Sequence, residues 1–249
     1  MAFKVTLRKD GIPYDSGYHY NCRTTILHAP EDVDNGELEV GLDLYLPGAG
    51  TNPVPAELET IYYVQKGEMT ADMGDGQEHV LKVGDSIHFG RGAKCAMKNK
   101  ASAPAEVLAM RIKPLTGIPT EMPEETKYKI TRSNEFYSYA PVPDTHKNCL
   151  TCRLHNAKDV NQGRFEVGIS FYLPGGGVHM PGDQYEMVYY VTEGVFTSPT
   201  PEGGECPMHP GDSVHFASRN FRISHNHGDE TVTMITIRVL PEGDPLCGK

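Results

Sequence analysis

The sequence has 249 residues, of which 38% are hydrophobic and 22% charged, values that are ordinary for a globular protein with a buried core. Its net charge of -10 at pH 7 argues against nucleic acid or an anionic membrane surface as a partner, because both attract a basic surface. The first residues hold no apolar run of signal-peptide length and no segment is long and apolar enough for a membrane span, so we expect a cytoplasmic protein whose six cysteines are reduced thiols.

Short strand-like segments, separated by turns rich in glycine and proline, fill the first half of the chain. Residues 37–46 alternate between polar and apolar side chains, which predicts a half-buried strand that ends at Pro47 and Gly48. No stretch keeps helical periodicity over several turns. The pattern is typical of an antiparallel sandwich or barrel. Further strands are predicted at residues 61–64, 78–81, 86–89, 95–98 and 105–113.

The second half repeats the first with a constant offset of 127 residues. Gly67 recurs as Gly194, the turn at 84–86 recurs at 211–213, and Arg111 recurs as Arg238. Residues 4–8 and 129–133 also resemble each other, so each half is expected to begin with an extension ahead of its barrel. The offset of 127 holds without a gap from residues 19–114 to residues 146–241, which indicates one fold used twice. It predicts an N-terminal barrel at 1–114, a linker at 115–127 and a C-terminal barrel at 128–249.

A recurring order of turns and strands resembles the cupin superfamily. In the second half a glycine-rich turn at 175–177 is followed by a strand ending at Gly194, a Pro-Gly-Asp turn at 210–212 and then Asn226. Two such copies in one chain resemble the bicupins. The resemblance implies an all-β protein made of two tandem cupin barrels, that is, jelly rolls or double-stranded β-helices. The functions found on this fold are diverse, so the fold alone does not define an activity.

The metal-ligand pattern of the cupins is not kept. The resemblance implies a His-x-His and Glu set in the first motif and a His in the second, around a divalent metal inside the barrel. Neither half has the full set, and in the first half most of these positions offer no good metal donor. The cofactor is therefore unknown from the sequence, with a divalent metal as an alternative. The positions hold Val54, Ala56, Thr60 and Cys95 in the first half, and Pro181, Asp183, Met187 and Arg222 in the second.

Arg222 is the strongest candidate ligand-binding residue. Strand parity places it inside the C-terminal barrel, where an isolated guanidinium is costly and requires an anion. That anion is either an internal carboxylate, from Glu186 or Asp183, or a carboxylate ligand held by the planar guanidinium. We therefore predict a pocket for a small organic acid; the alternative is a structural ion pair in an empty barrel. The other predicted lining residues are Tyr185, Met187, Tyr189 and Asn226.

Histidines are concentrated in the second half. His179 follows the glycine turn, and a small loop shift could bring it to Glu186, as an acid–base pair or, with Asp183 and His225, as a non-standard metal site. His215 recurs as His88, which favours a structural or inter-barrel role over catalysis.

Two other repeated features favour structure over chemistry. The repeated glutamates and arginines, Glu59 with Arg111 and Glu186 with Arg238, are expected to pair across strands within each barrel. Cys95 is interpreted as an inert buried thiol rather than a nucleophile.

Several functions fit these residues. The first is an isomerase, lyase or hydrolase acting on a small organic acid, with His179, Glu186 and His215 as catalytic candidates. The others are a non-catalytic ligand sensor, a metal-dependent enzyme with a non-standard site, and a structural relative without activity. In layout the chain is similar to the ureidoglycine aminohydrolases, whose second barrel is the active one. By the same analogy a homodimer is expected, unless one chain makes the barrel–barrel contact by itself.

Overall fold

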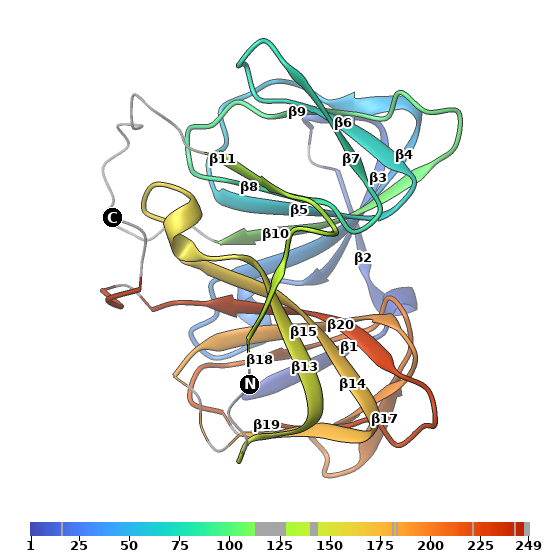
Figure 1. Cartoon of the computed structure of the whole chain (residues 1–249), viewed down its shortest axis with the longest axis vertical. Helices are drawn as coiled ribbons and strands as arrows, with labels where there is room; N and C mark the ends of the chain where they lie inside the picture. The colour runs from blue at the N-terminus through green and yellow to red at the C-terminus, as the bar shows by residue number, and fades with distance from the viewer. Residues whose placement is uncertain are drawn as a thin grey trace.

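The computed structural model describes residues 1–15, 17–112, 128–139, 144–180, 182, 184–220, 222–241 and 243–246. These residues form two ten-stranded antiparallel sheets, each curled into a barrel, one above the other in Figure 1. Three short 3-10 helices accompany them: η1 (Arg8–Asp10), η2 (Pro30–Asp32) and η3 (Ala157–Asp159). The predicted all-β class with two tandem barrels is confirmed. In the described part of the chain, no helix has the length and hydropathy of a membrane crossing.

The upper barrel of Figure 1 is built almost entirely from the first half of the chain. All the strands predicted there are present, whereas β2, β3 and β6 were missed. The strand predicted to end at Pro47 continues to Thr51, because Gly48 takes a φ of 78° and bends the chain while pairing resumes with His19. The strands are β2 (Ile12–Tyr14), β3 (His19–His28), β4 (Leu38–Thr51), β5 (Glu59–Lys66), β6 (Glu68–Asp72), β7 (Glu78–Lys82), β8 (Ser86–Phe89), β9 (Ala96–Lys98), β10 (Ala105–Ile112) and β11 (Tyr128–Thr131).

The lower barrel repeats this arrangement. Its central order, β18-β15-β20-β14, matches β8-β5-β10-β4 of the other sheet. The linker predicted at 115–127 lies outside the described residues. The strands are β1 (Phe3–Thr6), β12 (Tyr137–Tyr139), β13 (His146–His155), β14 (Phe165–Met180), β15 (Glu186–Glu193), β16 (Phe196–Pro199), β17 (Glu205–Met208), β18 (Ser213–Phe216), β19 (Arg222–His225) and β20 (Val232–Val239).

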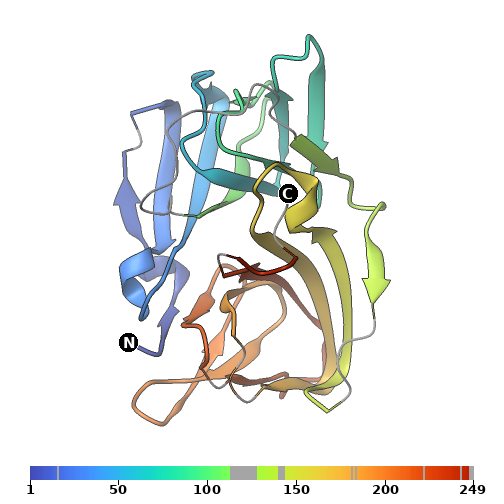
Figure 2. The ribbon, with the colours of Figure 1, turned by 90° about the vertical axis from the view of Figure 1, so that its left-hand side faces the viewer.

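The two halves exchange their first strands. β1 pairs antiparallel with β18 of the C-terminal barrel, and β11 pairs with β8 of the N-terminal barrel (Figures 1 and 2). The extensions that the sequence placed ahead of each half's own barrel therefore complete the sheet of the other half. This exchange joins the barrels through backbone hydrogen bonds, within a single chain.

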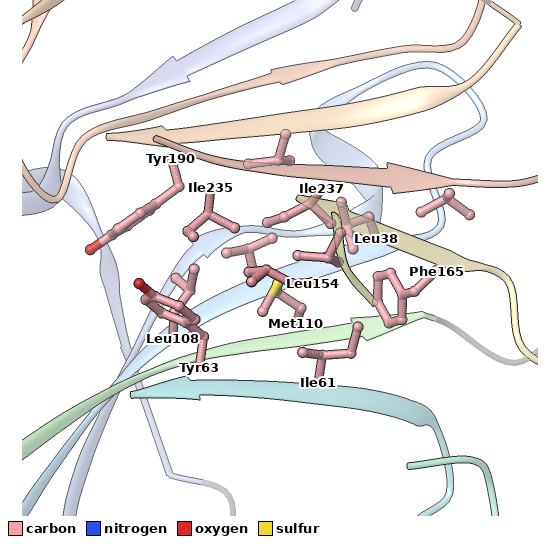
Figure 3. Close-up of a cluster of buried hydrophobic side chains, with 14 of the residues drawn as sticks. Leu38, Ile61, Tyr63, Leu108, Met110, Leu154, Phe165, Tyr190, Ile235 and Ile237 are labelled. Atoms are coloured by element: carbon pink, nitrogen blue, oxygen red, sulfur yellow. The ribbon is translucent and has the colours of Figure 1, made fainter. Parts of the chain in front are cut away.

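Each central strand buries both of its faces. Along β5, Ile61 and Tyr63 face the layer between the barrels, whereas Tyr62 and Val64 face the inside of their own barrel. The layer between the barrels is one continuous hydrophobic core drawn from both halves, and Figure 3 shows Tyr63 and Tyr190 at one end of it. In addition to this shared core, each barrel has its own hydrophobic core in its interior. Strand parity thus decides whether a side chain reaches the interior of a barrel or the contact between barrels.

Candidate functional site

Several residues predicted to line a pocket in the C-terminal barrel do face its interior. Met187 and Tyr189 of β15 are buried there among apolar side chains, as strand parity predicted. Tyr185 packs at the edge of the same core, and the guanidinium carbon of Arg238 lies 4.4 Å from the centre of its ring. These residues form an apolar wall. Their predicted role in binding a ligand stays a prediction.

Asn226 has structural partners on both ends of its amide. Its Nδ2 donates to the backbone oxygens of Tyr172, at 2.9 Å, and Glu230, at 2.7 Å. Its Oδ1 accepts from the backbone N–H of Gly228 at 3.0 Å. Asn99 makes the corresponding donations in the first half, to Tyr45 and Ala103. The amide therefore fastens a loop in each barrel, and both of its donor hydrogens are already used.

Glu186 and His215 meet at the contact between the barrels. The Nε2 atom of His215 lies 2.7 Å from Glu186 Oε1, and both side chains are buried. The same carboxylate accepts the backbone N–H groups of Glu37, at 2.8 Å, and Leu38, at 3.0 Å. This placement supports the inter-barrel interpretation of His215. Glu186 thus has its partners at the contact between the barrels.

The arginine–glutamate pairing expected within each barrel is wrong in its partners. Glu59 and Glu186 face the contact between the barrels. Arg111 of β10 instead contacts Glu39 of β4, which faces the inside of the N-terminal barrel. Arg238 contacts Glu166 of β14 in the same way. The sequence repeat correctly identified paired charges but not the face of the strand on which each lies.

The second-half histidines proposed as a metal or acid–base site do not converge on Glu186. His179 is exposed on β14 opposite Ile223 of β19, and His225 is half-buried with its ring centre 5.5 Å from that of His227. None of the three groups of metal-ligating side chains in the described part of the chain includes His179 or His225. Asp183 and the side chain of Arg222 lie outside the described residues, so the predictions that depend on them stay predictions.

The N-terminal barrel holds a cavity of about 510 Å³ that the sequence analysis missed. It opens inside the barrel between β3, β4, β5 and β10 and the loop before β5. The alternation of side chains along β4 and β10 could have indicated this cavity, because it places Glu39 and Arg111 on the inner face of the barrel. The principal polar lining residues are Tyr14, Tyr18, His19, Thr24, Glu39, Glu57, Thr60, Tyr62 and Arg111, and the apolar ones include Val54, Leu58, Phe89 and Cys95.

Arg111 is the charged centre of this cavity. Its NH1 lies 3.0 Å from Glu39 Oε1, its NH2 lies 3.8 Å from Asp43 Oδ2, and its guanidinium carbon lies 5.8 Å from the ring centre of Tyr62. Burial acts to lower the pKa of Arg111, but Tyr62 and the two carboxylates more than offset this and raise it. Arg111 is therefore a fixed cation that already has two anionic partners.

Asp43 lies behind Arg111 and is fully buried. Its Oδ2 is 3.5 Å from the hydroxyl of Tyr45, and its Oδ1 has no hydrogen-bond partner. Asp43 also lies close to His19 and Cys22, with one ligand atom of each within 4.8 Å of the others. Burial, and then the charge of Asp43, raise the pKa of the Cys22 thiol to about 12. These three residues could hold a cation, although Arg111 already places one positive charge beside them.

The cupin metal set does not fit the interior of the N-terminal barrel. Val54 and Ala56 have no donor atoms, and Thr60 offers only a hydroxyl. Burial raises the pKa of the Cys95 thiol to about 12, so it remains protonated. This is the environment of an inert buried cysteine, as the sequence suggested.

Comparisons with known proteins agree with the topology. A cupin domain family matches residues 42–111. Beta-D-galactosidase Rv1717 of Mycobacterium tuberculosis (strain ATCC 25618 / H37Rv) is 30% identical over 115 residues, which cover 46% of this chain and 98% of that protein. The curled two-sheet architecture, the matched domain and this relative together define the class: the chain belongs to the cupin family.

Two solved structures show the same arrangement over nearly the whole chain. The putative glyoxylate induced protein from Pseudomonas aeruginosa superposes with a TM-score of 0.75 at 16% identity, covering 96% of this chain and 88% of that one. The pirin YhhW from Escherichia coli, in complex with nickel(II), superposes with a TM-score of 0.65 at 14% identity, covering 96% and 99%. At these identities the likeness concerns the fold.

Proposed function

We propose that this cupin binds a neutral, polyhydroxylated small molecule, a sugar or a sugar-like polyol, in the cavity of its N-terminal barrel. The observation that carries the proposal is the charge around Arg111. One guanidinium faces the carboxylates of Glu39 and Asp43, so the interior of this barrel is net acidic. A carboxylate ligand would be repelled there, whereas hydroxyl groups can donate to Glu39 and accept from Arg111.

The shape and walls of the cavity support the same ligand class. Its volume lies in the range of small-molecule sites, roughly 300–1,000 Å³. Tyr62 and Phe89 form its inner aromatic wall, and Tyr14 and Tyr18 stand at its exposed rim. Flat aromatic faces pack against the C–H faces of sugar rings, while hydroxyls and charged groups contact the ring substituents. The relative that is 30% identical is named as a β-D-galactosidase, which makes galactosides the first ligands to try.

Glu39 is the residue best placed for chemistry on such a ligand. Its carboxylate lines the cavity and is oriented by Arg111 at 3.0 Å. An ionised carboxylate in this position accepts a proton from a hydroxyl or a water, which is the role of a general base. Glycoside hydrolysis also needs an acid on the other side of the bond. We therefore propose binding as the primary function and hydrolysis as the reaction to assay.

Calorimetric titration with galactose, lactose and a panel of related sugars tests the proposal. We expect one binding site per chain and affinity about tenfold weaker in Tyr18→Ala, which removes an exposed aromatic wall without disturbing the core. Tyr20→Ala is the matched control, because Tyr20 is on the same segment, is also exposed and does not line the cavity. Equal affinity in wild type and Tyr18→Ala, or no sugar binding at all, contradicts the proposal. A chromogenic galactoside assayed with wild type and Glu39→Gln tests hydrolysis.

The predicted organic-acid site in the C-terminal barrel is a second candidate, supported by the opposite charge balance there. Glu166 is contacted by both Arg153 and Arg238, and Glu186 is engaged between the barrels. The described charges inside this barrel are thus net basic, which favours an anionic ligand. A carboxylate that binds wild type and Tyr18→Ala alike, but not Arg222→Ala, would assign this site.

A further inference from the structure

Two polar clusters outside the barrel interiors lie at the contact between the halves. One contains His28, Asp32 and His215, and the other contains His155, Asp159 and His88. Each residue of the second cluster is 127 positions from its counterpart in the first, so the repeat has produced the site twice. Each cluster takes a histidine and an aspartate from one half and a histidine from the other.

The spacing of the donor atoms is unusual for hydrogen bonds. Asp159 Oδ2 lies 3.4 Å from His155 Nδ1 and 4.0 Å from His88 Nδ1. N–H···O hydrogen bonds span about 2.7–3.2 Å. Ligand atoms about 2.0–2.1 Å from a tetrahedral metal ion lie roughly 3.4 Å from each other. The donors are therefore closer to a metal-ligand arrangement than to a hydrogen-bonded one.

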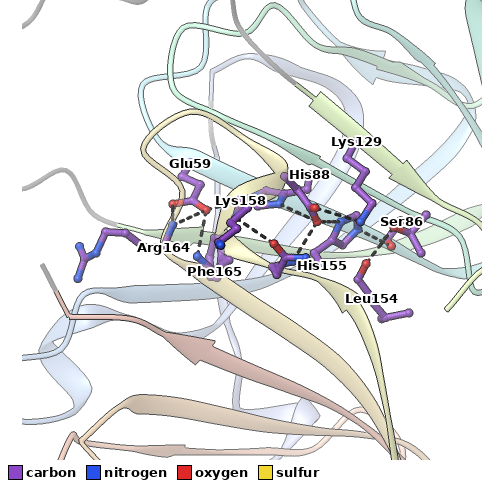
Figure 4. A network of polar contacts seen from close by, with 12 residues as sticks. Glu59, Ser86, His88, Lys129, Leu154, His155, Lys158, Arg164 and Phe165 are labelled. Carbon is purple, nitrogen blue, oxygen red and sulfur yellow. Dashed lines mark hydrogen bonds and ion pairs between the residues drawn. The ribbon is translucent and has the colours of Figure 1, made fainter. Parts of the chain in front are cut away.

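The outer nitrogens of the rings fix the direction of the inner lone pairs. His88 Nε2 is 2.8 Å from Glu59 Oε1, and His215 Nε2 is 2.7 Å from Glu186 Oε1. Figure 4 labels His88 and Glu59. A carboxylate accepts only, so each of these Nε2 atoms carries a hydrogen, and in the neutral form of the ring the lone pair lies on Nδ1. A histidine whose other nitrogen donates to a carboxylate is the usual arrangement around protein-bound zinc.

Three of the four inner nitrogens are left without a hydrogen-bond partner, and the fourth, His28 Nδ1, lies 3.5 Å from Thr6 Oγ1. The rings of His88, His155 and His215 are fully buried, and their Nδ1 atoms have no hydrogen-bond partner. An imidazole lone pair beside a carboxylate oxygen is repulsive until a proton or a metal cation lies between them. The cluster thus presents two nitrogens and one oxygen to a common centre.

The aspartates are held in place by their own partners. Asp159 Oδ2 accepts the backbone N–H of Asn156 at 2.9 Å, and its Oδ1 accepts Lys129 Nζ at 3.0 Å. Asp32 is held in the same way by Ala29 and Lys4. These contacts leave a lone pair of Oδ2 directed at the histidines, which lie 3.7 Å away in the case of His28.

We propose that each cluster binds one transition-metal dication of the zinc class, through the two histidine Nδ1 atoms and the aspartate Oδ2. Imidazole and carboxylate ligands suit Zn²⁺, Co²⁺ and Ni²⁺. Because each ion takes ligands from both halves, it would join the barrels in the manner of a structural metal site. These sites are separate from the barrel interiors where cupins carry their metal, and the proposal is independent of the sugar-binding function.

The test is metal stoichiometry after refolding, since the clusters are buried in the folded chain. The full chain is unfolded in denaturant, refolded with Zn²⁺, desalted, and analysed by elemental mass spectrometry. We expect two ions per chain for wild type, one for Asp32→Asn or for Asp159→Asn, and none for the double variant. Refolding with Co²⁺ adds a visible absorption that should fall by half in each single variant.

Asp212→Asn is the matched control, because Asp212 is also buried and also accepts backbone N–H groups, from Arg8 and His209, but belongs to neither cluster. It should keep both ions. Circular dichroism identifies any variant that does not refold. His88→Gln then replaces Asp159→Asn, and His215→Gln replaces Asp32→Asn. Refolded wild type without metal would show that protons, not metals, occupy the clusters. Metal that persists in the double variant would place it elsewhere, and either result overturns the proposal.

Discussion

The two barrels have the same arrangement of strands, but among the residues that the structure describes their interiors differ in charge balance. In the N-terminal barrel Arg111 faces two carboxylates, Glu39 and Asp43. In the C-terminal barrel one carboxylate, Glu166, faces two guanidinium groups, Arg153 and Arg238. This difference in charge arises at two equivalent positions of the repeat: Asp43 corresponds to Ser170, and Ile26 corresponds to Arg153. A few inward side chains therefore set the charge balance of each interior among the described residues.

The contact between the barrels shows the reverse behaviour. Ser86, His88 and Glu59 recur as Ser213, His215 and Glu186. In each set the serine contacts a histidine of the other half, and the histidine contacts the glutamate of its own half. The barrel interiors have diverged while this contact has been kept twice. The difference is consistent with a contact that holds the two barrels together, and with the two separate ligand classes proposed above for the interiors.

The largest effect is expected from matched removal of the interior carboxylates. Glu166→Gln takes away the carboxylate that Arg153 and Arg238 share, and disrupting such a buried ion pair costs about 3 kcal/mol of unfolding free energy. Glu39→Gln leaves Asp43 beside Arg111 and is more exposed, so its cost should be about 1 kcal/mol. Urea denaturation measures both. Equal losses would show that the two interiors do not differ in charge balance.

A smaller change, an increase in the free energy of unfolding, is expected from Asp43→Ser. This substitution introduces the residue found at the equivalent position of the C-terminal barrel, Ser170. Asp43 buries a carboxylate oxygen without a hydrogen bond, whereas the hydroxyl of Ser170 lies 3.3 Å from Thr151 Oγ1 and 3.2 Å from Thr236 Oγ1. Removing an unsatisfied buried acceptor should raise the free energy of unfolding by about 1 kcal/mol. Sugar binding should weaken at the same time, because the interior loses an acidic charge. A destabilised variant with unchanged binding would refute a functional role for Asp43.

The smallest effect concerns the thiol of Cys95, whose counterpart in the sequence repeat is Arg222. The pKa of Cys95 is raised to about 12 by burial and by Asp72, so at pH 8 almost none of it is thiolate. Iodoacetamide should modify it far more slowly than a free cysteine, with a rate that rises about tenfold per pH unit up to that pKa. Mass spectrometry follows the reaction, with the more exposed Cys206 as the internal reference. Rapid modification of Cys95 at neutral pH would indicate an activated thiol.

The sequence by itself determined the repeat, the all-β class and most of the strands. Alternation of side chains and the turns rich in glycine and proline are local signals, so they are readable without a structure. Strand β5 shows the limit: its run of Ile61 to Val64 is apolar on both faces, and such a run does not say which face meets the other barrel. The expected pairing of Glu59 with Arg111 was wrong for this reason.

Only the tertiary structure decided which residues from the two halves come together. The exchange of β1 and β11 is a pairing between distant segments, and nothing in either segment specifies its partner sheet. The clusters that contain His28 and His88 also take their side chains from both halves. The cavity around Arg111 likewise depends on which side chains share an interior. Local sequence sets the strands, but long-range packing sets the sites, because a site is made of residues that only the fold brings into contact.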